Sequence, residues 1–133
     1  MFLVKDPIVG LVEHVAGPDI IDIEIRYSDD LVAVTVSGEL DVSNAAWLDD
    51  TLHHAIENGA AEVIVDLAAL TFMDSAGLSV LEDAHTRLHV SGGTLSILNP
   101  TPRVARLLEI TGLLSLLSIP QLRKNRATRN DAS

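Results

Sequence analysis

The hydrophobic pattern of the chain changes its period part-way along, and this change limits the folds that the sequence can adopt. Residues 20–28 and 31–37 alternate apolar with polar side chains, as half-buried strands do, and Asp29-Asp30 between them favours a turn. From Ser43 the apolar residues instead recur every three or four positions, up to a stop at Asn58-Gly59. The sequence therefore predicts a β-hairpin followed by an amphipathic helix.

The rest of the chain alternates short apolar runs with segments of helical spacing. Residues 62–67 are apolar and β-branched, which predicts a central strand buried on both faces, and residues 94–98 predict another strand. Helical spacing occurs over 78–88 and again after Pro102, before a last predicted strand at 113–119. This order predicts an α/β fold with a mixed central sheet of about five strands, an opening β-hairpin and helices packed on the sheet.

The length and composition fit a single domain. At 133 residues, 47% hydrophobic and only 3% aromatic, the chain must build one core from Leu, Ile, Val and Ala. Residues 20–120 carry the strand and helix patterns and form the predicted domain. Residues 1–19 have no clear period and are expected to be an N-terminal arm or an extra edge strand, and residues 121–133 a basic flexible tail.

Charge and cysteine content exclude several functions. The net charge of the chain is −10. The tail at residues 121–133 carries +3, so residues 1–120 carry −13. A domain this acidic repels the phosphate backbone of DNA and RNA, so we expect no nucleic acid partner. The absence of cysteine excludes disulfides and thiolate metal sites. The N-terminus lacks the order of a signal peptide and no apolar run reaches about 18 residues, so we expect a cytoplasmic protein without a membrane span.

The pair Asp74-Ser75 interrupts the apolar run TFMDSAGLSVL at residues 71–81. Asp and Ser are preferred helix N-caps because each satisfies a free N–H group of the first turn. A helix N-terminus also stabilises negative charge. A phosphoryl group on Ser75 would add about −1.5 to −2 charge units there without breaking the helix. The junction is therefore a cap, a phosphoacceptor site, or both.

Three segments together resemble the STAS-domain anti-sigma-factor antagonists of bacteria: VSGELD at 36–41, LAALTFMDSAGLSVLEDAHTRL at 67–88 and GGTLSILNPTPRVARLLEITGLLSLL at 92–117. The resemblance runs in order over residues 21–119 and implies the STAS fold. It also implies that an anti-sigma factor, itself a Ser kinase, phosphorylates Ser75. The unphosphorylated antagonist would bind the anti-sigma factor and free a sigma factor. Phosphorylation would abolish binding, and a separate Ser phosphatase would reset the protein.

The resemblance also implies a docking face around Ser75. Its members are expected to be Asp41, Ser43, Asp74, Ala76, Gly77 and Leu78. Asp41 and Asp74 would lie beside the hydroxyl and orient it as a hydrogen-bond donor. Gly77 would let another backbone approach closely, while Leu78 is expected to pack inward. Many relatives have a second Ser where this chain has Ala76, and Ser79 is a weaker candidate for modification.

Other constellations do not predict catalysis or a cofactor. His85 and His89 lie four residues apart but lack the HExxH pattern, and the adjacent His53-His54 should face different ways, so we expect no metal site. The Ser75 segment resembles half of a hydrolase nucleophile elbow, but Met73 replaces its first Gly, which argues against an enzyme. Trp47 lies off the main apolar stripe and is either a partner anchor or shallowly packed. A homodimer is left open.

Two further functions were considered. In a receiver-like domain phosphorylated on aspartate, Asp66 would accept the phosphoryl group and Asp29-Asp30 would bind magnesium, but that pair lies in a hairpin. STAS domains also occur as scaffold subunits of stress-signalling or transporter complexes, and the fold alone does not choose between these uses. The intact Asp74-Ser75 pair favours sigma regulation.

Overall fold

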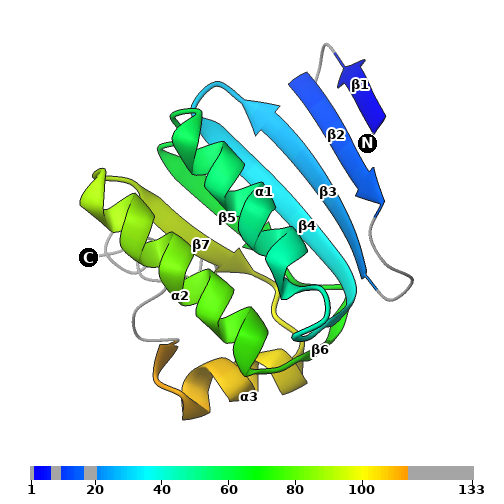
Figure 1. Cartoon of the computed structure of the whole chain (residues 1–133), viewed down its shortest axis with the longest axis vertical. Coiled ribbons are helices and arrows are strands. Elements are labelled where there is room, and N and C mark those ends of the chain that lie inside the picture. The colour runs from blue at the N-terminus through cyan, green and yellow to red at the C-terminus, as the bar shows by residue number, and fades with distance from the viewer. Residues whose placement is uncertain (1, 7–9, 17–20, 114–133) are drawn as a thin grey trace, which may run out of the picture.

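The computed structural model describes residues 2–6, 10–16 and 21–113. This part of the chain forms seven strands and three helices (Figure 1). They are, in order, β1 (Phe2–Asp6), β2 (Gly10–Ala16), β3 (Ile21–Ser28), β4 (Leu31–Leu40), α1 (Ala45–Glu57), β5 (Glu62–Asp66), β6 (Leu70–Met73), α2 (Ser75–Val90), β7 (Thr94–Leu98) and α3 (Pro102–Ile110).

The strands form one mixed sheet in the order β1-β2-β3-β4-β5-β7, and β6 pairs with β4 beyond the end of β5. Pairing is antiparallel from β1 to β4 and parallel for β4 with β5, β4 with β6 and β5 with β7. The predicted hairpin is confirmed, with Ser28 paired to Leu31 across the turn. Asp29 adopts a positive φ of 52°, a left-handed conformation that Asp tolerates better than most residues.

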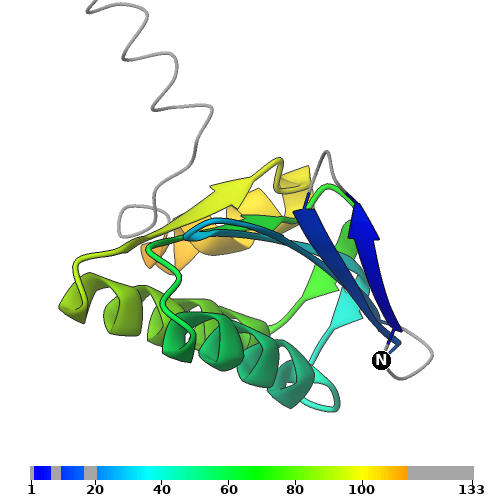
Figure 2. The same cartoon turned by 90° about the horizontal axis from the view of Figure 1, so that it is seen from above.

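The α1 and α2 helices lie side by side on one face of the sheet, and α3 lies on the other side near β6 (Figure 2). The core fills the space between the sheet and α1 and α2. Alternate residues of β3 and β4 are buried there, as the period of two predicts. Fully buried side chains include Ile23, Val34, Leu48, Leu52, Val65, Leu81 and Ile97. Each such aliphatic side chain stabilises the fold by roughly 1.5–3 kcal/mol.

Some sequence predictions differ from the structure, and others fall on residues that the structure does not describe. The strand β6 was not predicted, and the predicted strand at 113–119 lies outside the described residues apart from Leu113, which is buried. The expectation that residues 62–67 are buried on both faces is wrong, because Ile64 is only half-buried while its neighbours Val63 and Val65 are fully buried. The N-terminal residues form two strands that extend the sheet beyond β3. The predicted tail at 121–133 lies outside the described residues.

None of the helices in the described part of the chain combines the length and the apolar character needed to cross a lipid bilayer.

Candidate functional site

The candidate site lies where the parallel strands β4 and β6 end side by side. Leu40, the last residue of β4, pairs with Met73, the last residue of β6. The pairing continues one step further, because the Asp74 N–H donates to the Leu40 carbonyl at 3.2 Å. The carboxyl ends of parallel strands meet at one edge of a sheet, so Asp41 and Asp74 follow neighbouring strand ends. The fold thus brings together two segments that lie about 33 residues apart in the sequence.

Asp74 is the N-cap of α2. Its side chain accepts a hydrogen bond from the Ala76 N–H at 2.9 Å, which satisfies one free donor of the first turn. Ser75 is the first helical residue and is exposed. Among the described residues, its hydroxyl makes no hydrogen bond. The cap interpretation is therefore confirmed for Asp74, and Ser75 presents its hydroxyl at the positive end of the helix, where a phosphoryl group could be accommodated.

The turn between β4 and α1 forms the other half of the site, and its hydrogen bonds fix its shape. Asp41 Oδ1 accepts from the Ser43 N–H at 2.9 Å and from the Ser43 hydroxyl at 2.5 Å. The Asp41 carbonyl accepts from the N–H groups of Asn44 and Ala45 at 3.1 and 2.8 Å. These bonds form the turn that leads into α1, and they hold Asp41 and Ser43 in one arrangement.

Asn44 stabilises this turn from inside the protein, and the sequence analysis missed it. Its side chain is 2% exposed. Its Nδ2 donates to the Glu39 carbonyl at 2.9 Å, and its Oδ1 accepts from the Asp41 N–H at 3.0 Å. The amide thus joins the end of β4 to the start of α1. Asn just before a helix is a signal for an N-cap, but Asn44 makes no side-chain cap to its own helix.

Several of the predicted site residues have surroundings that differ from the expectation. Neither Asp41 nor Asp74 accepts a hydrogen bond from the Ser75 hydroxyl, and each uses Oδ1 to bind nearby groups in its own segment. Gly77 is buried, and a Cβ there would lie 2.7 Å from side-chain carbons of Leu40 and of Met73. Its missing side chain therefore makes room for the protein's own core, where we had expected room for another backbone.

The other predicted residues divide between core and surface. Leu78 is buried, as expected. Ser43 and Ser75 are exposed, and Asp41, Asp74 and Ala76 are half-buried. The Ser79 hydroxyl donates to the Ser75 carbonyl at 3.0 Å, so it is engaged by the helix backbone. An approaching partner would find five of the predicted side chains at this edge, with Gly77 and Leu78 beneath them.

Comparison with known proteins identifies the family. The family model described as STAS domain matches residues 22–131. The chain belongs to the STAS domain family. This match spans the two segments that form the candidate site.

Individual relatives of this STAS domain are anti-sigma-factor antagonists by name. The chain is 35% identical over 99 residues to an anti-sigma-B factor antagonist of Staphylococcus epidermidis, covering 74% of this chain and 92% of the relative. An anti-sigma factor antagonist from Mycobacterium paratuberculosis has a similar structure, with a TM-score of 0.70, 25% identity and coverage of 86% and 97%. The phosphorylated form of the Bacillus cell fate determinant SpoIIAA shares the fold, with a TM-score of 0.61, 23% identity and coverage of 79% and 98%.

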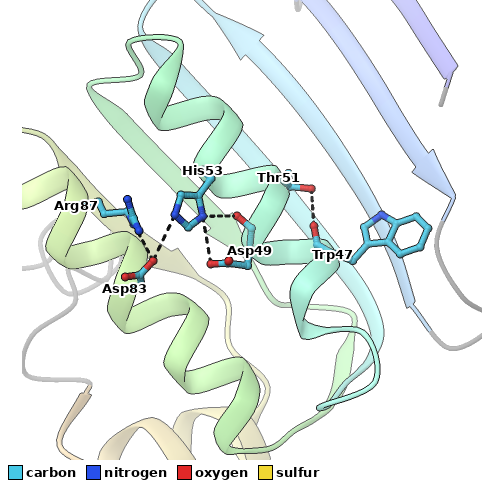
Figure 3. A network of polar contacts seen from close by, with 6 residues as sticks. All are labelled: Trp47, Asp49, Thr51, His53, Asp83 and Arg87. Carbon is cyan, nitrogen blue, oxygen red and sulfur yellow. Dashed lines mark hydrogen bonds and ion pairs between the residues drawn. The ribbon is translucent and has the colours of Figure 1, made fainter.

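A second polar cluster of the STAS domain links α1 to α2 away from Ser75 (Figure 3). The ring of His53 lies between Asp49 Oδ1, 3.3 Å from Nδ1, and Asp83 Oδ2, 3.7 Å from Nε2. Nδ1 also lies 3.0 Å from the Asp49 carbonyl. Arg87 donates to the same Asp83 oxygen at 2.8 Å, and this hydrogen bond raises the pKa of Arg87. His54 is exposed, so the two adjacent histidines face different ways, as predicted.

The donor atoms of this cluster lie within 4.8 Å of one another, and one imidazole with two carboxylates is a ligand set that suits Zn²⁺. However, Arg87 already contacts Asp83, and both ring nitrogens of His53 face acidic side chains. We therefore assign the cluster to the contact between the two helices. The other histidine pair, His85 and His89, stacks with ring centroids 6.1 Å apart.

The structure also bears on Trp47 and on the receiver alternative. Trp47 is partly buried and packs against the core, although its spacing lies off the main stripe. The receiver-like arrangement is wrong. The Asp30 carbonyl accepts from the N–H groups of Ala61 and Glu62 at the start of β5, whereas Asp66 is the last residue of that strand. The acidic pair and Asp66 thus lie at opposite ends of β5 and do not form one magnesium site.

Proposed function

We propose that this protein is an anti-sigma-factor antagonist controlled by phosphorylation of Ser75. The unphosphorylated form binds an anti-sigma factor and so frees a sigma factor, and phosphorylation at Ser75 abolishes this binding. The observation that carries the proposal is the exposed Ser75 hydroxyl, which stands at the N-terminus of α2 without a hydrogen-bond partner among the described residues. Relatives named anti-sigma-B factor antagonist over most of the chain support the same role.

The free energy that the switch requires is small. A loss of about 3 kcal/mol of binding free energy weakens an interaction more than a hundredfold. Phosphorylation brings a group of about −1.5 to −2 charge units to the surface. Asp41 and Asp74 follow the ends of neighbouring strands at this edge, so the group adds to negative charge that is already there. Burying such a group in an interface without a cation costs several kcal/mol in desolvation and repulsion.

The partners follow from this scheme. The kinase is the anti-sigma factor itself, a Ser kinase, and a separate Ser phosphatase returns the protein to its binding form. The antagonist acts by binding, without catalysis, cofactor or nucleic acid, and we place it in the cytoplasm with its partners. A homodimer is not required, because one copy carries the complete site. The docking face comprises the exposed and half-buried residues at the strand ends: Asp41, Ser43, Asp74, Ser75 and Ala76.

The test is to incubate the protein with ATP and each purified anti-sigma factor kinase encoded in the same genome, and to map the modified residue by mass spectrometry. We expect one acid-stable phosphoserine at Ser75. In calorimetry with the active kinase, Ser75→Ala should keep its affinity and Ser75→Glu should bind at least tenfold more weakly. The matched control is Ser91→Glu, which places the same charge on an exposed residue at the other end of α2, where we expect the affinity to stay unchanged.

Equal affinities of Ser75→Ala and Ser75→Glu would contradict the proposal. A STAS scaffold subunit of a stress-signalling or transporter complex would bind its partners equally well with either substitution. Thus the same titration separates the two uses of the fold.

A further inference from the structure

An apolar side chain stands in solvent beside the candidate site. Val42 lies in the turn between β4 and α1, directly between Asp41 and Ser43, and is 82% exposed. Single exposed apolar residues are common on protein surfaces, so exposure alone carries no inference. Its position and the rigidity of its turn are what distinguish Val42.

The hydrogen bonds on both sides of Val42 fix its backbone. Asp41 binds the N–H groups of Ser43, Asn44 and Ala45, and the buried Asn44 side chain binds Glu39 and Asp41 in return. The turn therefore holds the backbone on both sides of Val42 in one arrangement before any partner arrives. A preorganised backbone contributes to affinity because less conformational entropy is lost on binding.

Val42 also lies within the area that a partner of Ser75 must cover. Leu40 and Met73 are paired at the ends of their strands. Val42 comes two positions after Leu40, and Ser75 comes two positions after Met73, so both lie at the same edge of the sheet. Neighbouring strands are about 4.8 Å apart. A typical interface covers about 800 Å² of each partner, which corresponds to a circle of roughly 16 Å radius. A protein that seats itself on Ser75 therefore also covers the turn that carries Val42.

We propose that Val42 is the apolar anchor of the docking face, and that the anti-sigma factor receives it in a hydrophobic pocket next to its contact with Ser75. This inference rests on the proposed function and adds the chemistry of the partner surface. Asp41 and Ser43 flank the anchor in the chain, and Asp74 follows the neighbouring strand end, which fits the common arrangement of an apolar contact with a polar rim. The anchor supplies affinity, and Ser75 supplies control by its charge.

The chain offers a matched control in Val90. It is 83% exposed, so it equals Val42 in residue type and exposure. It is the last residue of the 16-residue helix α2, whose first residue is Ser75, and the ends of such a helix lie about 22–24 Å apart. Val90 therefore lies outside the footprint centred on Ser75.

The experiment measures the affinity of Val42→Ala, Val90→Ala and Val42→Ile for the kinase that modifies Ser75 in the assay above. Removing two buried methyl groups at about 0.8 kcal/mol each should raise Kd roughly tenfold for Val42→Ala. We expect Val90→Ala to stay within twofold of the wild type and Val42→Ile to bind at least as tightly. The thermal unfolding midpoints of all three should match the wild type, since neither valine is buried.

The outcomes separate the anchor from the switch. If Val42→Ala and Val90→Ala bind alike while Ser75→Glu still weakens binding, the anchor is wrong and the proposed function stands. If Ser75→Glu binds as tightly as Ser75→Ala, or if no anti-sigma factor kinase modifies Ser75, the proposed function fails, and the anchor fails with it.

Discussion

Replacing Asn44 by Ala tests whether the buried amide holds the turn that carries half of the site. The substitution removes both hydrogen bonds of the side chain, the one to the Glu39 carbonyl and the one from the Asp41 N–H. Asn44 is 2% exposed, so water does not freely replace the lost partners. The variant would leave the Glu39 carbonyl and the Asp41 N–H without these partners in a part-buried place.

The expected loss of stability follows from these two groups. Leaving one buried polar group unsatisfied costs about 1–3 kcal/mol. The two groups are part-buried, so we expect the lower half of the combined range, about 2–4 kcal/mol for Asn44→Ala. That is a large share of the 5–15 kcal/mol by which domains are typically stable. With a slope of about 2 kcal/mol per molar urea, the unfolding midpoint should fall by roughly 1–2 M.

The assay is urea unfolding followed by circular dichroism, with Asn58→Ala as the matched control. The Asn58 side chain also donates to a backbone carbonyl, that of His54 at 2.7 Å, but it is exposed at the other end of α1. Water can replace that bond, so we expect Asn58→Ala to cost less than about 1 kcal/mol. If Asn44→Ala unfolds within about 0.5 kcal/mol of the control, the buried amide does not stabilise the turn, and the rigidity inferred for Val42 is refuted.

Substitutions at two further residues test the start of α2. Gly77→Ala should destabilise the protein by roughly 1–2 kcal/mol in thermal unfolding, because the new Cβ would lie 2.7 Å from carbons of Leu40 and Met73. This overpacking should outweigh the higher helix propensity of Ala. A variant more stable than the wild type would contradict the packing. Asp74→Ala should lower Tm by about 3–5 °C, because it removes a helix cap that contributes about 1 kcal/mol. Asp74→Asn keeps a capping oxygen, so its Tm should stay near that of the wild type. Equal losses of Tm in both variants would show that capping is not the role of Asp74.

Most elements could be predicted from the sequence because their signals are local. The alternation in β3 and β4 and the helical spacing in α1, α2 and α3 give each element from its own residues. The strand β6 has four residues, of which Leu70 and Met73 are buried and Thr71 is exposed, so it shows no clean period. It forms by pairing with the end of β4, next to the irregularity at Gly38 and Glu39. Such a long-range partner is invisible in the local pattern.

The sequence shows the residues of the candidate site but not their interactions. A cap signal at Asp74 and an adjacent hydroxyl are visible in the sequence, and the structure joins them as expected. The direction of a carboxylate is not visible, because it depends on which N–H groups lie nearest after folding. Thus Asp41 binds its own turn, and Gly77 faces Leu40. The role of Asn44 depends on burial beneath a turn, which no spacing rule reports.

The site separates the groups that hold the fold from the group that we propose to be modified. Asp74 caps α2 through the Ala76 N–H, and Asn44 and Asp41 fix the opposite turn. The Ser75 hydroxyl belongs to neither set, and among the described residues it gives up no hydrogen bond when it gains a phosphoryl group. The helix dipole compensates part of the added charge at this position. We therefore expect the fold to tolerate the proposed modification, and we expect its free-energy cost to appear where a partner must bury the charge.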